Sequence, residues 1–296
     1  MKRATVLALA VILLNSCALY KERIASNASL LSTETIEEQY GPKGELVEIH
    51  YQCSVPGPTG RRMLVYLPEG YGDSSRRFPV LYLLHGARGN ETSWITKGDV
   101  LQLADSLYSN GLAEPAILVF TNGNSYKDDA DFGNSRRKGA VECLFGIEGA
   151  TESAYLVDVV STVDSTFRTI PDKQHRAIAG MSIGGLQSMY ISARNPESFG
   201  FVGLFSPLCK PPVKPGDYAW FYKDLKDNLK SQFENAPDVY DIEVGRADIL
   251  YSQISDYVRY LYNHDYPFQY YEYSGGHEWY NWKKSFCNFS NMIFRD

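Results

Sequence analysis

Residues 176–185 read RAIAGMSIGG, and the predicted fold follows from this stretch and its surroundings. The apolar segment Arg176–Ala179 is typical of a short buried strand, and Ile183–Arg194 has the spacing of a helix that stops before a proline. Residues 180–184 match G-x-S-x-G, the pattern of a sharp strand-to-helix turn that exposes a serine. Glycines flank the serine because larger side chains would clash in so tight a turn. Ser182 is therefore the predicted nucleophile.

Strands and helices alternate on both sides of this turn. Continuous apolar runs such as Phe78–Leu84 are typical of buried parallel strands, and a Pro-Gly-Pro turn joins the first two strands as an antiparallel pair. The pattern predicts a mostly parallel central sheet with helices on both faces. The expected strands are Leu46–Gln52, Arg62–Leu67, Phe78–Leu84, Ala116–Thr121, Arg176–Ala179, Phe201–Phe205, Val239–Val244 and Phe268–Tyr273, and the expected helices are Ser153–Phe167, Ile183–Arg194 and Asp248–Tyr262.

A serine hydroxyl attacks only when a base removes its proton. The histidines that follow Ser182 are His264 and His277. His264 ends the predicted helix Asp248–Tyr262, where a cationic cap is favourable. His277 follows the last strand and two glycines, at the strand edge where catalytic groups collect in open α/β sheets. His277 is therefore the predicted base.

The base needs an acidic partner that orients the imidazole and stabilises its cation. Asp248 follows a predicted strand and Gly245, so it lies at the same edge of the sheet. Asp265 is the alternative, and capping of the next helix is the alternative role for Asp248. Asp248 is the predicted acid.

An oxyanion hole requires two backbone N–H donors. The residue after the nucleophile, Ile183, is the expected first donor. The loop that follows Leu84 contains two glycines, which let its backbone approach a substrate, and Ala87 is the predicted second donor. His85 precedes this donor and is interpreted as a structural loop residue.

Composition limits the classes of partner. The chain has 35 acidic and 29 basic residues, a net charge of −6, so it has no broad basic face for nucleic acid. Its 22 tyrosines and 4 tryptophans suit a sugar or a phenolic ligand, because aromatic planes stack on both. Trp94, Trp220 and Trp279 are candidate substrate walls, and core packing is the alternative for each.

The N-terminus is typical of an export signal. Lys2 and Arg3 precede the apolar run Ala4–Leu14, which is too short to span a bilayer. Residues 14–17 read LNSC and resemble a bacterial lipobox, in which the cysteine, here Cys17, carries a lipid anchor. We expect a signal peptide over residues 1–17, a flexible tether over 18–42 and one catalytic domain over 43–296. The protein would then be anchored in the bacterial cell envelope, at its periplasmic or outer surface.

The remaining cysteines are scattered and lack C-x-x-C spacing, which disfavours a zinc site, and we expect no metal. They are Cys53, Cys143, Cys209 and Cys287. Four cysteines allow three pairings, and the sequence does not choose among these or a fully reduced state.

Four blocks of the sequence resemble the esterase D family. They are LLHG at 83–86 with ETSW at 91–94, the stretch 176–185, Gly245 with Asp248, and GGHEW at 275–279. They occur in the family's order and span roughly residues 45–290. The resemblance implies an α/β-hydrolase fold, cleavage of carboxylic esters without metal or cofactor, and the roles given above to Ser182, Asp248 and His277. The stretch Asn122–Phe145 departs from the family pattern.

The family includes feruloyl and acetyl-xylan esterases, mycolyltransferases and S-formylglutathione hydrolases. Together with the export signal and the aromatic composition, the resemblance predicts an exported serine esterase. We expect it to act on feruloyl or acetyl esters of plant polysaccharides through an acyl-enzyme. An acyltransferase with the same three residues, or a non-catalytic sugar-binding protein on this scaffold, is the alternative. The sequence does not distinguish the natural ester, the membrane face or the oligomeric state.

Overall fold

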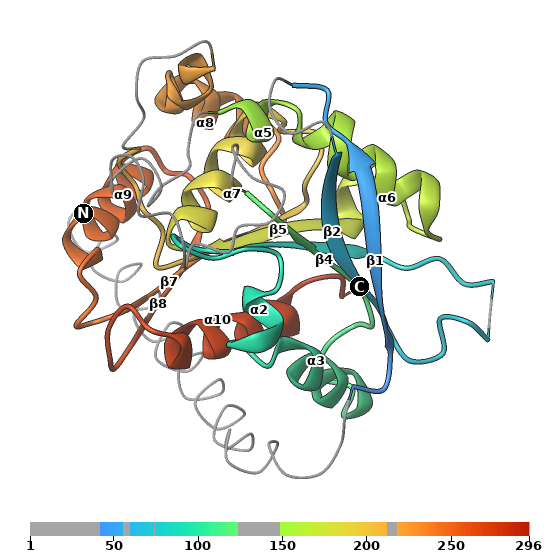
Figure 1. The fold of residues 1–296 in the computed structure, drawn as a ribbon. Helices are drawn as coiled ribbons and strands as arrows, with labels where there is room; N and C mark the ends of the chain where they lie inside the picture. Colours follow the sequence, from blue (N-terminus) through green and yellow to red (C-terminus); the bar gives the residue numbers. More distant parts are fainter. Residues whose placement is uncertain (1–41, 56–59, 74, 124–148, 212–217, 296) are drawn as a thin grey trace, which may run out of the picture. The chain divides into compact units, whose positions relative to one another are not determined.

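An eight-stranded sheet runs through the residues that the computed structural model describes, which are 42–55, 60–73, 75–123, 149–211 and 218–295 (Figure 1). These residues belong to the second of two compact units, Pro42–Asp296. The predicted signal peptide, the tether and Cys17 lie outside the described residues. The strands are β1 (Glu45–Gln52), β2 (Gly60–Leu67), β3 (Val80–Leu84), β4 (Ile117–Thr121), β5 (Arg176–Met181), β6 (Phe201–Phe205), β7 (Val239–Gly245) and β8 (Gln269–Tyr273).

The strand order is β1-β2-β4-β3-β5-β6-β7-β8. β1 and β2 pair antiparallel, β2 pairs antiparallel with β4, and every later pair along this order is parallel. The strands from β3 to β7 are buried along their whole length, as strands covered on both faces must be. The predicted antiparallel opening pair and the mostly parallel sheet are therefore confirmed, although the turn between β1 and β2 lies outside the described residues.

Helices cover the two faces of this sheet. α7 packs on β5 and β6 and also contacts α8, whereas α10 packs on β6 and β7 and also contacts α3. Figure 1 shows α5, α6, α7 and α8 on one side of the sheet and α2, α3 and α10 on the other. The helical elements are α2 (Ser93–Thr96), α3 (Val100–Ser109), α5 (Ala150–Ser153), η3 (Leu156–Val160), α6 (Ser161–Thr166), η4 (Lys173–His175), α7 (Ile183–Arg194), η5 (Ala219–Tyr222), α8 (Leu225–Glu234), α9 (Tyr251–Asn263) and α10 (Trp279–Met292). Among them, none has the length and apolar run that a membrane crossing requires.

Two of the predicted helices differ from the observed ones. The expected helix Ser153–Phe167 is divided into α5, the π-helical turn η3 and α6. Side-chain hydroxyls compete with backbone amides for carbonyl oxygens in this segment. Thr162 Oγ1, for example, donates to the carbonyl oxygen of Asp158 at 2.6 Å. The expected helix Asp248–Tyr262 begins three residues later as α9 because the Asp248 carboxylate accepts from the Leu250 amide at 2.7 Å and forms a turn first.

β7 carries two buried carboxyl groups on the face that α10 covers. Asp241 and Glu243 are both 0% exposed. Asn288 of α10 donates to Glu243 at 2.6 Å, and the Tyr273 hydroxyl donates to the other oxygen of Glu243 at 2.6 Å. Burial raises the pKa of Glu243. Burial and then the charge of Glu243 raise the pKa of Asp241 well above its usual value, so the fold favours a protonated Asp241.

This raised pKa makes stability depend on pH. A carboxyl group with a higher pKa in the folded state contributes stability at acidic pH and loses it as the pH rises through the folded pKa. Asp241→Asn removes the ionisation. We therefore expect the free energy of unfolding of this variant to exceed that of the wild type at about pH 9 and to lose this advantage towards about pH 4. Urea titrations at several pH values measure it, and a constant difference between the two proteins would contradict the prediction.

Candidate active site

Ser182 occupies the turn between β5 and α7, at the edge of the sheet where the parallel strands end. Its backbone angles are φ 55° and ψ −113°, which a residue with a side chain rarely adopts. Neighbouring segments hold this conformation: the Ser182 amide donates to the Phe205 carbonyl at 2.9 Å, and the Ser182 carbonyl accepts from the Leu208 amide at 2.9 Å. The strain is therefore maintained by β6 and the loop that follows it.

Two glycines make room for this turn. A Cβ atom on Gly180 would lie 2.4 Å from the carbonyl carbon of Gly184. A Cβ atom on Gly184 would lie 2.4 Å from the Leu84 carbonyl oxygen and 2.6 Å from that of His85. Contacts this short with backbone atoms force the chain to shift, so the pattern G-x-S-x-G has a steric cause here.

Gly184→Ala is expected to lower the free energy of unfolding by about 1–3 kcal/mol, because the added methyl group overpacks the start of α7 against β3. The matched control is Gly60→Ala, since a Cβ atom there meets nothing within 4 Å. We expect the control to change stability by less than about 1 kcal/mol. Urea denaturation compares the two variants, and equal losses would show that crowding at Gly184 is not the cause.

The structure brings the three predicted catalytic residues together. His277 Nε2 lies 3.0 Å from Ser182 Oγ, and His277 Nδ1 lies 3.1 and 3.0 Å from the two carboxylate oxygens of Asp248. Asp248 follows β7 and His277 follows β8, so the group comes from the ends of β5, β7 and β8, at one edge of the sheet. The alternative histidine, His264, is the C-cap of α9 as expected, and Asp265 directly follows it.

Asp248 is 6% exposed and accepts several hydrogen bonds. Burial opposes its ionisation, but hydrogen bonds from His277, the Leu250 amide and the Ser206 hydroxyl outweigh burial and lower the pKa of Asp248. An ionised Asp248 only accepts, so Nδ1 of His277 carries the hydrogen and Nε2 keeps its lone pair for the Ser182 hydroxyl. The alternative role, a side-chain cap of α9, is not observed: the N-cap of α9 is Leu250, which makes no side-chain cap, and the contact of the Leu250 amide with Asp248 belongs to the turn before the helix.

Ser206 is a residue at this site that the sequence analysis missed. It is 1% exposed, has a φ of 46°, and its amide donates to the Glu243 carbonyl at 2.7 Å. Its side chain helps to lower the pKa of the Asp248 carboxyl group. The available signal was its position, since it is a polar residue directly after β6, at the same edge of the sheet as the other three residues.

The two predicted oxyanion donors lie on segments that flank Ser182. Ile183 is the first residue of α7, where amide groups lack partners within the helix. Ala87 is exposed and belongs to the loop after β3. That loop is close to the nucleophile, because a Cβ atom on Gly86 would lie 3.4 Å from the Cβ of Ser182. The assignment of both amides to an oxyanion hole remains a proposal.

Trp279, a predicted substrate-wall residue, packs against Trp282, which in turn contacts His277. It is partly exposed and begins α10, two residues after His277. Its ring meets Trp282 edge to face at 5.3 Å between centroids, and Trp282 in turn meets the His277 ring at 5.0 Å.

The other two predicted walls need correction. Trp94 is 1% exposed, and its Nε1 donates to the Leu84 carbonyl at 3.1 Å, so it fills the core beneath Trp279 and offers no surface to a substrate. Trp220 is 47% exposed, but Arg194 lies over its ring at 5.1 Å. Arg194 ends the 12-residue helix α7, which is about 18 Å long, and Ser182 lies at the other end of this helix.

In the described part of the chain, no group of three or more His, Cys, Asp or Glu side chains is placed to hold a metal ion. Cys53, Cys209 and Cys287 are free thiols, and Cys143 lies outside the described residues.

A serine in a strained strand-to-helix turn, with an aspartate and a histidine on later strand-end loops of a mostly parallel sheet, defines the α/β-hydrolase fold. The family model named Esterase matches residues 58–291, and the chain belongs to this family.

Solved structures share this fold. One is a ferulic acid esterase with a TM-score of 0.68 and 24% identity, covering 86% of this chain and 100% of that one. Another is a CE1 ferulic acid esterase from Anaeromyces mucronatus, with a TM-score of 0.71 and 24% identity, covering 87% and 93% of the two chains. An S-formylglutathione hydrolase from Staphylococcus aureus has a TM-score of 0.65 and 17% identity, covering 84% and 96%. At such identities the likeness shows the fold alone.

Curated relatives match over shorter stretches. An endo-1,4-beta-xylanase/feruloyl esterase from Xylanibacter ruminicola is 38% identical over 146 residues, which are 48% of this chain and 19% of the relative. Endo-1,4-beta-xylanase Y from Acetivibrio thermocellus is 29% identical over 180 residues, which are 59% of this chain and 15% of the relative. This chain therefore matches less than a fifth of the length of either relative.

Proposed function

We propose that the protein is a serine carboxylic-ester hydrolase that releases ferulic acid from feruloyl esters of plant polysaccharides through an acyl-enzyme. The main support for this proposal is the continuous hydrogen-bonded series Asp248–His277–Ser182, whose contacts are 3.0 to 3.1 Å long. A serine held in this way is activated for attack on a carbonyl carbon.

The proposed reaction has two steps. His277 Nε2 takes the proton of the Ser182 hydroxyl as its oxygen attacks the ester carbonyl, and the Asp248 carboxylate stabilises the imidazolium. The amides of Ile183 and Ala87 stabilise the negative oxygen of the tetrahedral intermediate. The alcohol leaves with the proton from His277. Water then loses a proton to His277, attacks the acyl-enzyme, and releases the acid and free Ser182.

Two observations support a feruloyl substrate. One relative is named as an endo-1,4-beta-xylanase/feruloyl esterase, and solved structures with the same fold are named as ferulic acid esterases. In addition, Trp279 is partly exposed, follows His277 by two residues and packs against Trp282, whose ring contacts His277; an exposed indole at this position can stack on a flat aromatic acid.

A substrate panel tests this proposal. We expect methyl ferulate and feruloylated arabinoxylan oligosaccharides to release ferulate at kcat/KM values at least about tenfold above that for acetate release from acetylated xylo-oligosaccharides. Preferred release of acetate would replace the feruloyl proposal with an acetyl-ester one. Cleavage of p-nitrophenyl acetate without cleavage of any feruloyl ester would overturn the proposed substrate class.

Location is part of the same proposal. The apolar run Ala4–Leu14 and the lipobox-like residues before Cys17 support export and lipid anchoring at the cell envelope. Mass spectrometry of protein extracted from membranes tests it: a diacylglyceryl group on an N-terminal Cys17 is expected, and a mature protein without that lipid would contradict it.

A further inference from the structure

His85 directly follows β3 and lies between two peptide groups. Its Nε2 is 3.0 Å from the Gly123 amide nitrogen, and its Nδ1 is 2.8 Å from the Gly86 carbonyl oxygen. An amide N–H can only donate and a carbonyl can only accept, so these contacts require the neutral ring with its hydrogen on Nδ1. Burial, which leaves His85 5% exposed, lowers the pKa of its ring and favours the same neutral form. His85 therefore accepts on one side and donates on the other.

The donor side of His85 fixes the peptide group that carries the Ala87 amide. The Gly86 carbonyl accepts from His85 Nδ1 and also from the Gly89 amide at 3.1 Å. The C=O and N–H of a trans peptide point in opposite directions. Two donors hold the Gly86 carbonyl, so the Ala87 N–H is directed to the opposite side of this peptide group. Gly86, the other residue of the peptide group, is the part of the loop that approaches Ser182.

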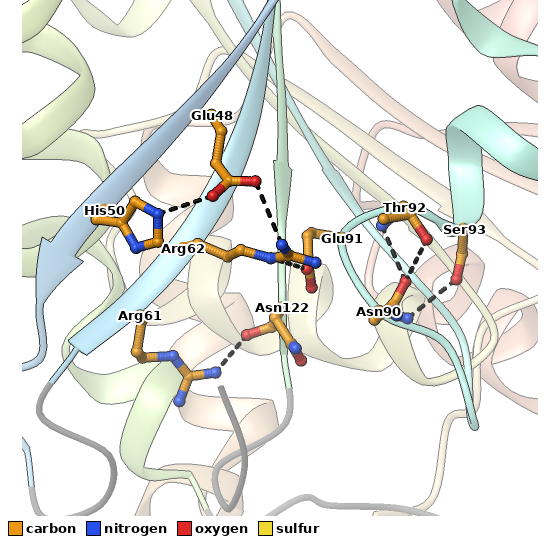
Figure 2. A network of polar contacts seen from close by, with 9 residues as sticks. All are labelled: Glu48, His50, Arg61, Arg62, Asn90, Glu91, Thr92, Ser93 and Asn122. Atoms are coloured by element: carbon orange, nitrogen blue, oxygen red, sulfur yellow. Dashed lines mark hydrogen bonds and ion pairs between the residues drawn. The ribbon is translucent and has the colours of Figure 1, made fainter. Parts of the chain in front are cut away.

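The acceptor side of His85 leads to a buried cation. The Gly123 amide belongs to the peptide group of the Asn122 carbonyl, which accepts from Arg61 Nη2 at 2.6 Å (Figure 2). Arg61 lies on β2, is 2% exposed and carries a permanent charge. The hydrogen bonds thus run in one direction, from Arg61 through one peptide group to His85, and from His85 through a second peptide group to Ala87.

The far end of the same loop is also fixed to β2. Arg62 Nε donates to Glu91 at 2.6 Å, and the Glu91 side chain is 1% exposed. Asn90 receives a hydrogen bond from the Thr92 amide, and its own amide donates to Ser93 Oγ (Figure 2). Two adjacent arginines of β2 therefore hold the loop after β3, one at its start through His85 and one at its end through Glu91.

We propose that His85 and Arg61 are positioning residues of the oxyanion hole, which fix and polarise the Ala87 amide through this one-way series of hydrogen bonds. The inference rests on the proposed function, in which Ala87 donates to the intermediate. Successive hydrogen bonds polarise one another, and the positive charge of Arg61 complements the negative charge that develops on the ester oxygen at the opposite end. Pre-oriented donors of this kind act in the transition state and not on the bound ester.

Two His85 variants separate the two contacts. His85→Gln places an amide near the position of Nε2, so it keeps an acceptor for Gly123 but removes the donor to Gly86. His85→Asn places an amide near Nδ1, so it keeps the donor to Gly86. For p-nitrophenyl acetate we expect His85→Gln to lose about 10²–10³-fold in kcat with KM nearly unchanged, and His85→Asn to recover at least about tenfold of this loss. His264→Gln, at the end of α9, is the control with unchanged kcat.

The result that would overturn the inference is an equal loss in both His85 variants, or a loss that appears in KM alone. Because p-nitrophenyl acetate reports on the oxyanion hole whichever acid the enzyme prefers, failure to cleave methyl ferulate would overturn the proposed substrate and leave this comparison valid.

A second measurement needs neither variant nor substrate. In ¹⁵N NMR of the wild-type protein at pH 7, we expect His85 as the neutral ring with a slowly exchanging hydrogen on Nδ1. A charged ring, or a hydrogen on Nε2, would overturn the inference even if the His85 variants failed to fold.

Discussion

Replacing Ser182 with alanine is expected to lower kcat for p-nitrophenyl acetate by about 10⁶-fold, because no other described hydroxyl lies against His277 Nε2. Steady-state kinetics with methyl ferulate should show a loss of the same size. Alanine adopts the φ of 55° about as poorly as serine, so the free energy of unfolding should change by less than about 1 kcal/mol.

The matched control is Ser192→Ala. Ser192 is a buried serine of α7, the helix that follows Ser182. Its hydroxyl donates to the Met189 carbonyl at 3.2 Å. We expect this variant to keep its turnover while losing about 1 kcal/mol of stability. Turnover by Ser182→Ala within tenfold of the wild type would refute the assignment of the nucleophile.

Asp248→Asn is expected to lower kcat by about 10⁴-fold while the fold is retained. The Asn amide can donate to Nδ1 of His277, and this stabilises the tautomer whose hydrogen is on Nε2. That tautomer cannot accept the proton of Ser182. The Asn oxygen still accepts from the Leu250 amide, so α9 should begin at the same residue. A pH–rate profile measured with the wild type and the variant gives the size of the loss.

Asp265→Asn is the control for this prediction, because Asp265 was the alternative acid and lies just beyond α9. We expect its kcat to equal that of the wild type. If Asp248→Asn lost less than about tenfold, or Asp265→Asn lost as much, Asp248 would not be the residue that orients His277.

The elements nearest Ser182 were predictable because local sterics determine them. The helix Ile183–Arg194 has the predicted bounds, since the strained turn and the close contact at Gly184 leave one place for it to start. Asp248 and His277 were predictable for a related reason, because parallel strands end at the same edge of a sheet and bring their following loops together.

The aromatic residues were harder to predict because their burial depends on packing between distant elements. Trp94 lies in the four-residue helix α2, which is too short to show a periodic pattern, and it is buried by contact with Trp279 and Phe286 of α10. Ser206 was missed because its φ of 46° and its effect on the pKa of Asp248 arise only after β6 and β7 pair. The series from Arg61 to Ala87 likewise needs β2, β3 and β4 side by side.

In the proposed mechanism, Asp248 and His277 activate Ser182. A fluorophosphonate probe reacts only with an activated serine, and peptide mass spectrometry locates the adduct. We predict one phosphonyl group on Ser182 in the wild-type protein, much slower labelling in Asp248→Asn, and none at any residue in Ser182→Ala. A wild-type protein that stays unmodified, or that carries the group on another residue, would contradict the assignment of Ser182 as the activated nucleophile.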